Sequence, residues 1–182
     1  MAVARTPRGK WIEQGLRALA DGGPEAVRVE ALAQALGVTK GGFYWYFGDR
    51  DTLLREMLDT WEKEVTAEVI ERVESGGGDA RTRLLRLSDV VPGLTTDIHT
   101  DLAIRDWARR DEAVAQRLRR VDTRRMDYLR ALFSEFCPDE EEAEARSMIA
   151  FSVWIGGHLI AAEHPDRDRG EVERLVWDRL RA

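Results

Sequence analysis

Glycine and proline breaks divide this 182-residue sequence into segments that each have the length of a helix. Between the breaks, apolar residues recur mainly three and four positions apart, as in Ile12, Leu16 and Leu19, which is the period of one helix face. Alternation typical of strands is scarce, so the pattern predicts an all-α fold. Helices are expected at residues 7–21, 29–36, 40–47, 50–74, 79–91, 101–109, 112–136, 140–163 and 170–181. Side chains placed to cap four of them are Thr39, Asp49, Asp111 and Asp139.

Charge, cysteine content and hydropathy exclude several classes of protein. The net charge of −6 argues against a protein that coats nucleic acid without specificity, although basic side chains slightly outnumber acidic ones in the first 50 residues. The single cysteine, Cys137, cannot form an internal disulfide, and the first residues do not resemble a secretion signal. The most apolar stretch, Met148–Ala162, is shorter than the roughly 20 residues that a membrane span needs. We therefore expect a cytoplasmic protein without a membrane segment.

The segment Val29–Phe47 predicts two short helices joined by a sharp turn. Gly37 follows the first helix and permits the left-handed backbone that ends a helix and redirects the chain. Phe43 and Phe47 are spaced to anchor the buried side of the second helix, and Thr39 is placed to cap it. The outer face would then carry Lys40, Gly41, Gly42, Tyr44, Trp45 and Tyr46. This is the pattern of a helix-turn-helix, which places its second helix in the major groove of DNA.

The residue types on this outer face suit contact with DNA. Lys40 can neutralise a phosphate or reach a guanine edge, and the tyrosine hydroxyls can donate to phosphate oxygens. Gly41 and Gly42 would let the helix backbone approach DNA with no side chain between them. Arg50, at the start of the next helix, can hold a further phosphate.

A resemblance to a known family lies in LAQALGVTKGGFYWYFGDRDTLL, which is similar to the DNA-binding signature of the TetR family of transcriptional regulators. The resemblance is looser in RDWARRDEAVAQRLRRVDTRRMDYLRALF. It implies a three-helix DNA-binding head, residues 1–50, and a larger helical body, residues 51–182, that binds effectors and dimerises through its last two long helices. The DNA contacts that it implies are Thr39, Lys40, Gly41, Gly42, Tyr44, Trp45, Tyr46 and Arg50.

Two positions depart from the family's pattern. Arg28 stands where threonine or serine often precedes the first helix of the pair, so the usual cap is lost there. We still include Arg28 among the predicted DNA contacts, because its side chain can reach a phosphate. Arg50 replaces the commoner lysine and should do the same electrostatic work with more directional hydrogen bonds.

Two sets of residues in the body are candidates for binding. The side chains that either line an effector pocket or only pack in the core are Trp61, Trp107, Tyr128, Phe151, Trp154 and His158, the last as a polar group in an apolar pocket. The residues expected at the dimer interface are Val153, Gly156, Gly157, Ile160, Val172, Leu175 and Val176, where the glycine pair would allow two helices to approach closely.

The sequence as a whole predicts a TetR-like regulator that binds operator DNA as a homodimer and is released by an unknown small-molecule effector. No metal site is expected, because the three histidines and Cys137 lie at no recognised ligand spacing, and no cofactor is expected. An enzyme is not expected, because no nucleophile–base pair stands out. Two alternatives remain open. One is a helix-turn-helix module that binds protein, and the other is a small helical enzyme that uses scattered residues such as His99, Asp101 and Asp106.

Overall fold

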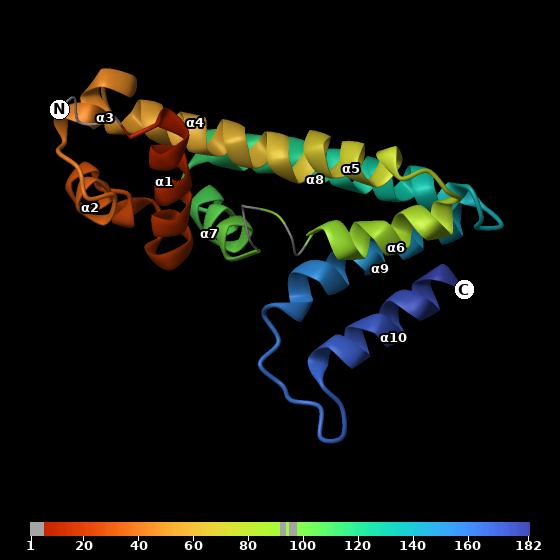
Figure 1. The fold of residues 1–182 in the computed structure, drawn as a ribbon. Coiled ribbons are helices and arrows are strands. Elements are labelled where there is room, and N and C mark those ends of the chain that lie inside the picture. The colour runs from red at the N-terminus through yellow and green to blue at the C-terminus, as the bar shows by residue number, and fades with distance from the viewer. Residues whose placement is uncertain (1–5, 92–93, 95–97) are drawn as a thin grey trace. The chain divides into compact units, whose positions relative to one another are not determined.

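The computed structural model describes residues 6–91, 94 and 98–182, and all regular structure among them is helical, as the sequence predicts (Figure 1). The elements in chain order are α1 (Arg8–Gly22), η1 (Pro24–Ala26), α2 (Val29–Ala35), α3 (Gly41–Tyr46), α4 (Arg50–Lys63), η2 (Glu64–Glu68), α5 (Val69–Ser75), α6 (Ala80–Val90), α7 (Ile98–Ala108), α8 (Glu112–Ser134), α9 (Glu140–Gly157) and α10 (Arg169–Arg181). Of these, η1 is a 3-10 turn and η2 is a π-helical turn. Among the residues described, none of the helices has the length and apolar character that crossing a bilayer demands.

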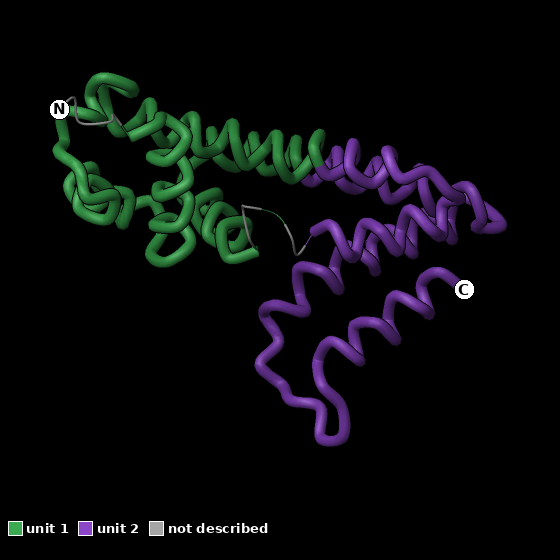
Figure 2. Tube along the Cα trace, in the orientation of Figure 1, with its two compact units in different colours: residues 1–68, 92–121 green, residues 69–91, 122–182 purple. Residues whose placement is uncertain are grey.

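The chain forms two compact units (Figure 2). The first unit comprises Met1–Glu68 and Pro92–Val121, and the second comprises Val69–Val91 and Asp122–Ala182. Each unit has its own cluster of buried apolar side chains. The first unit contains α1 to α4 and α7, so the helix-turn-helix shares a core with helices far along the chain. A functional boundary at residues 50 and 51 stays a prediction, because compactness does not report which residues bind DNA or effector.

Aromatic side chains and a close helix crossing form the centre of the first unit. Trp11 of α1 and Phe43 of α3 are fully buried and pack edge to face, with ring centroids 5.6 Å apart. The helices α1 and α4 approach closely at Gly15, where a Cβ atom would lie 2.6 Å from Met57 Sδ. Any larger residue at Gly15 would therefore require the Met57 side chain to move.

Three of the aspartate caps predicted from the sequence are present in the structure. Asp49 accepts a hydrogen bond from the Thr52 amide at 2.7 Å, and Asp139 accepts one from the Glu142 amide at 2.8 Å. Asp111 accepts two amide hydrogen bonds at the start of α8. Each cap satisfies amides that have no partner within the helix, so these three boundaries follow from local sequence.

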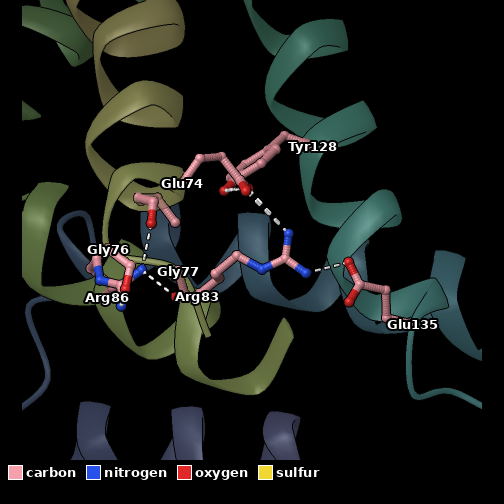
Figure 3. Close-up of polar contacts among 8 residues, drawn as sticks. Glu74, Gly76, Gly77, Arg83, Arg86, Tyr128 and Glu135 are labelled. Carbon is pink, nitrogen blue, oxygen red and sulfur yellow. Dashed lines mark hydrogen bonds and ion pairs between the residues drawn. The ribbon is translucent and has the colours of Figure 1, made fainter. Parts of the chain in front are cut away.

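A polar network joins α5, α6 and α8 in the second unit (Figure 3). Tyr128 donates its hydroxyl to Glu74 Oε1 at 2.6 Å, and Arg83 donates to the Glu74 carboxylate at 3.2 Å and also to Glu135. The Tyr128 hydroxyl, with Arg83, holds the pKa of Glu74 below its ordinary value, while burial and the Glu74 carboxylate raise the pKa of Tyr128. Arg86 donates to carbonyl groups at the end of α5: those of Val73, Gly76 and Gly77.

The helix predicted over residues 140–163 is shorter than expected. It ends at Gly157, and Ile160 lies in the connection to α10. Two glycines in succession weaken a helix, and Arg169 of α10 then donates to the carbonyls of Gly157, Ile160 and Ala162. The helix can therefore end before the apolar run does, because the Arg169 side chain satisfies the carbonyl groups that the end of the helix leaves without donors.

A buried carboxylate joins α4 to α7 within the first unit. The indole N–H of Trp61, which is fully buried, donates to Asp101 Oδ1 at 3.2 Å. Arg105 donates its Nε–H to Asp101 Oδ2 at 2.9 Å. Because a buried carboxylate is costly without donors, the bond from Trp61 of α4 and the bond from Arg105 within α7 together satisfy Asp101.

Trp61→Phe should lower the free energy of unfolding by about 1–3 kcal/mol, because phenylalanine removes a donor from the buried Asp101 carboxylate. Urea unfolding followed by circular dichroism measures this loss. Trp107→Phe is the matched control, since Trp107 is only half-buried and no described residue accepts a hydrogen bond from its indole. Equal losses for the two variants would contradict a specific role of the Trp61–Asp101 bond.

Candidate nucleic-acid interface

The turn between α2 and α3 has the geometry that the sequence predicts. Gly37 has a φ of +67°, in the left-handed region that favours glycine. The Val38 amide donates to the Ala33 carbonyl at 2.9 Å, a hydrogen bond that closes the end of α2. Val38 also packs against the buried apolar cluster of the first unit. The two helices therefore form a helix-turn-helix.

Two phenylalanines fix the inner face of α3. Phe43 is fully buried and Phe47 is 4% exposed, and their rings stack with centroids 5.2 Å apart. The α3 helix has only 6 residues, a length that is marginal without tertiary contacts. Its orientation therefore depends on the side chains that it buries.

The outer face of α3 presents aromatic side chains to solvent. Tyr44 is 55% exposed and Trp45 is 67% exposed. Large aromatic side chains left in water beside a well-packed core mark a surface that a partner can cover. Thr39, Lys40 and Gly41 are exposed beside them. Tyr46 instead packs partly against the core, and a Cβ atom at Gly42 would lie 3.7 Å from the buried Trp11 ring.

Thr39 does not cap α3, contrary to the prediction. The helix begins at Gly41, one residue later than expected, and no side chain caps it. Its first turn is closed by backbone groups instead, since the Gly42 amide donates to the Thr39 carbonyl at 3.2 Å. The exposed Thr39 side chain stays a predicted DNA contact.

Lys40 is paired with a carboxylate of α2 in the free protein. Its Nζ lies 2.8 Å from Glu30 Oε1, and both side chains are exposed. The hydrogen bond from Lys40 holds the pKa of Glu30 below its ordinary value, and the same bond raises the pKa of Lys40. Exposed pairs of this kind are weak, so a phosphate can take the place of the Glu30 carboxylate.

Arg28 and Arg50 differ in their contacts. Arg28 is exposed, provides no side-chain cap for α2, and has no side-chain partner among the described residues. Arg50 is partly buried and donates its Nε–H to the Val27 carbonyl at 2.6 Å and an Nη2–H to the Pro24 carbonyl. No sequence pattern indicates this contact, because it joins the first residue of α4 to a turn that lies more than 20 positions earlier.

The candidates for an effector pocket do not all belong to one unit. Trp61 and Trp107 belong to the first unit, whereas Tyr128, Phe151, Trp154 and His158 belong to the second. Trp61 is a core residue, as described above. Phe151 and Trp154 are half-buried with ring centroids 5.7 Å apart, and the Arg125 guanidinium lies 4.9 Å from the Trp154 centroid.

His158 does not lie in an apolar pocket, contrary to the expectation. It is exposed at the end of α9, and its Nδ1 lies 2.9 Å from the Trp154 carbonyl oxygen. The glycine pair ends the helix one residue earlier, which leaves the imidazole in solvent. In the part of the chain that the structure describes, no three histidine, cysteine or acidic side chains gather as metal ligands.

The predicted dimer residues lie on α9, on α10 and between them. Those that are partly buried within the second unit are Val153, Gly156, Gly157, Val172 and Val176. Ile160 and Leu175 are exposed, and so are Met148, Ile149 and Leu159 of the same apolar run. A dimer interface at these residues stays a prediction.

The helix-turn-helix region matches the sequence model of a known family. Residues 12–57 match the family described as bacterial regulatory proteins, tetR family. The match begins in α1, includes the whole of α2 and α3, and ends in α4. These are the helices that build and support the exposed face of α3.

Individual proteins are similar over most of the chain. The HTH-type transcriptional regulator BetI of Burkholderia ambifaria (strain MC40-6) is 27% identical over 160 residues, which are 84% of this chain and 82% of that protein. A TetR transcriptional regulator from Legionella pneumophila has the same fold with a TM-score of 0.72 and 11% identity, over 100% of this chain and 96% of that one. The ketosteroid transcriptional regulator KstR2 of Mycobacterium tuberculosis has a TM-score of 0.66 at 14% identity, over 98% of this chain and 95% of that one.

Glu30→Gln should raise affinity for double-stranded DNA by roughly two- to fivefold, because it frees Lys40 and removes a negative charge beside the exposed face. Fluorescence anisotropy with a labelled duplex at fixed salt measures the change. Glu25→Gln is the matched control, an exposed glutamate of η1 that has no ion pair among the described residues. Unchanged or weaker binding by Glu30→Gln would show that the Lys40–Glu30 pair does not compete with DNA.

Proposed function

We propose that this chain, which belongs to the TetR family of transcriptional regulators, is a repressor that binds operator DNA through α3. One observation carries the proposal: Tyr44 and Trp45 are held in solvent by a short helix whose other face is fixed by buried phenylalanines. Lys40 lies at the start of the same helix and supplies a cation for a phosphate or a guanine. The proposed direct DNA contacts are Arg28, Thr39, Lys40, Gly41, Gly42, Tyr44, Trp45 and Tyr46. These are the predicted contacts other than Arg50, whose guanidinium donates to the Pro24 and Val27 carbonyls.

The operator is proposed to be nearly palindromic and to be bound by a homodimer. Two copies of α3 would enter successive major grooves about 34 Å apart, one helical turn of DNA. The proposed interface is formed by α9 and α10, and it is supported by the exposed apolar side chains of Met148, Ile149 and Leu175. A second copy related by twofold symmetry would remove these side chains from water.

Release from the operator is proposed to follow binding of a small molecule to the helical body. The proposed effector contact lies at the half-buried pair Phe151 and Trp154, where the Arg125 guanidinium also lies over the Trp154 ring. A ligand that prefers one arrangement of the dimer lowers operator affinity by its differential binding, and DNA lowers ligand affinity by the same factor. The protein is proposed to act in the cytoplasm, on DNA that is accessible there.

The double variant Lys40→Ala Tyr44→Ala should bind operator roughly 10- to 100-fold more weakly, because it removes two side chains of the exposed face. Selection of bound fragments from random duplex DNA first defines the operator, and anisotropy with that duplex then measures affinity. If Lys40 neutralises a phosphate, the slope of log affinity against log salt becomes shallower by about 0.9. The circular dichroism spectrum should not change, since both side chains lie outside the core.

Lys63→Ala is the matched control for the loss of one positive charge, because Lys63 is exposed at the far end of α4. It should bind the selected operator like the wild type. Full affinity of the double variant would contradict a role of α3 in DNA recognition. A selection that enriches no sequence would contradict operator binding itself and would favour a protein-binding role for the helix-turn-helix.

Gly41→Ala should keep or slightly raise stability, by up to about 1 kcal/mol, while weakening operator binding. A Cβ atom at Gly41 would meet only Thr39 Oγ1 within 4 Å, at 3.8 Å, so the fold does not require glycine there. The proposed requirement is close approach of the α3 backbone to DNA. Thermal unfolding and operator anisotropy measure the two effects, with Gly9→Ala in α1 as control, because a Cβ there meets nothing within 4 Å. Undiminished operator affinity of Gly41→Ala would exclude such an approach at this residue.

A further inference from the structure

The turn before α2 contains buried backbone carbonyl groups that lie outside any α-helix. Pro24 and Val27 are both buried, and η1 ends between them. The Pro24 carbonyl accepts from the Val27 amide at 3.2 Å and from Arg50, and the Val27 carbonyl accepts from Arg50 Nε at 2.6 Å. A buried carbonyl without a donor is costly, so Arg50 satisfies a group that the local backbone leaves open.

The helix that follows this turn begins without a side-chain cap. Arg28 has the extended backbone of a residue at that position, with φ −114° and ψ 131°, but its side chain accepts no hydrogen bond from the first turn of α2. Arginine has no acceptor atom with which to make one. Elsewhere in the chain, Asp49, Asp79, Asp139 and Asp168 cap helices with their side chains. The starts of α1 and α3 also lack a side-chain cap, and α2 differs from them in that the Arg50 contact lies directly before its N-cap residue.

We propose that Arg50 is a positioning residue, which fixes the start of α2 through the carbonyls of Pro24 and Val27 in place of a cap at Arg28, and acts on DNA recognition through α2. The effect on DNA rests on the proposed function, whereas the effect on α2 does not. The effect on α2 extends to α3 because both helices pack in one core, where Leu32 of α2 and Phe43 of α3 are buried. The role differs from the phosphate contact that a basic residue at the start of α4 would otherwise suggest.

The guanidinium group is what makes this contact possible. Its Nε and Nη2 donate to two different carbonyls at once, and the planar group holds both donors in a fixed geometry. A lysine ammonium is a single donor atom on a flexible stem, so it keeps the charge but loses the two-point contact. Arg50→Lys therefore separates positioning from charge.

The test measures Arg50→Lys in two ways. Hydrogen exchange of the α2 amides from Leu32 to Leu36 should lose roughly tenfold in protection, because the start of the helix is released. Affinity for the operator selected with the wild-type protein should also fall roughly tenfold, although the charge is retained. A residue that only neutralised a phosphate would tolerate lysine, with affinity and protection both close to wild type, and that result would overturn the proposal.

Arg28→Thr supplies the rescue, because threonine at this position can cap α2. In the Arg28→Thr background, Arg50→Lys should lower the exchange protection of the α2 amides and the operator affinity by less than about twofold each. Since Arg28 is itself a proposed DNA contact, the comparison is the cost of Arg50→Lys in the two backgrounds, a double-mutant cycle. Equal costs in both backgrounds would contradict the proposal. If no operator is found, the proposed function fails, and the exchange of the α2 amides still decides whether Arg50 holds α2.

Discussion

The burial of Phe43 and Phe47 beneath α3 is the contact on which the proposed DNA-binding surface depends. A helix of 6 residues has little stability of its own, and each fully buried phenylalanine contributes about 1.5–3 kcal/mol relative to an exposed one. Trp11 of α1 adds an edge-to-face contact to Phe43 on the buried side of α3. Because the inner face is fixed in this way, Tyr44 and Trp45 are presented in a defined direction.

The distribution of charge restricts how such a surface can bind DNA. The whole chain carries a net charge of −6, Lys40 is paired with Glu30 in the free protein, and Arg50 is engaged by backbone carbonyls. Few cations are therefore left to attract phosphates without regard to sequence, and non-specific binding depends on such cations. In the proposed complex, a larger share of the affinity would then come from groups that contact base edges and the sugar-phosphate backbone in one register.

The sequence predicts the features that rest on local rules and misses those that rest on contacts between distant segments. The period of apolar residues and the chemistry of Gly37, Asp49 and Asp139 predict the helices and the turn, because each acts within one or two turns of helix. Local spacing does not report a side chain that reaches backbone carbonyls elsewhere in the chain. Arg50 and Arg169 are two such cases, and they explain a missed constraint on α2 and an early end of α9. Trp61 is a third, since its buried partner Asp101 lies 40 positions away.

These long-range contacts give α4 a particular place in the first unit. At its first residue, Arg50 holds the turn before α2, and near its last, Trp61 holds Asp101 of α7. The helix has 14 residues, a length of about 21 Å at the usual rise, and an aspartate cap stabilises its first turn. Both contacts use the same helix, so a displacement of α4 would disturb the turn before α2 and the buried carboxylate of α7 together. Residues of α4 that do not touch DNA in the proposed complex therefore take part in supporting the helices behind α3.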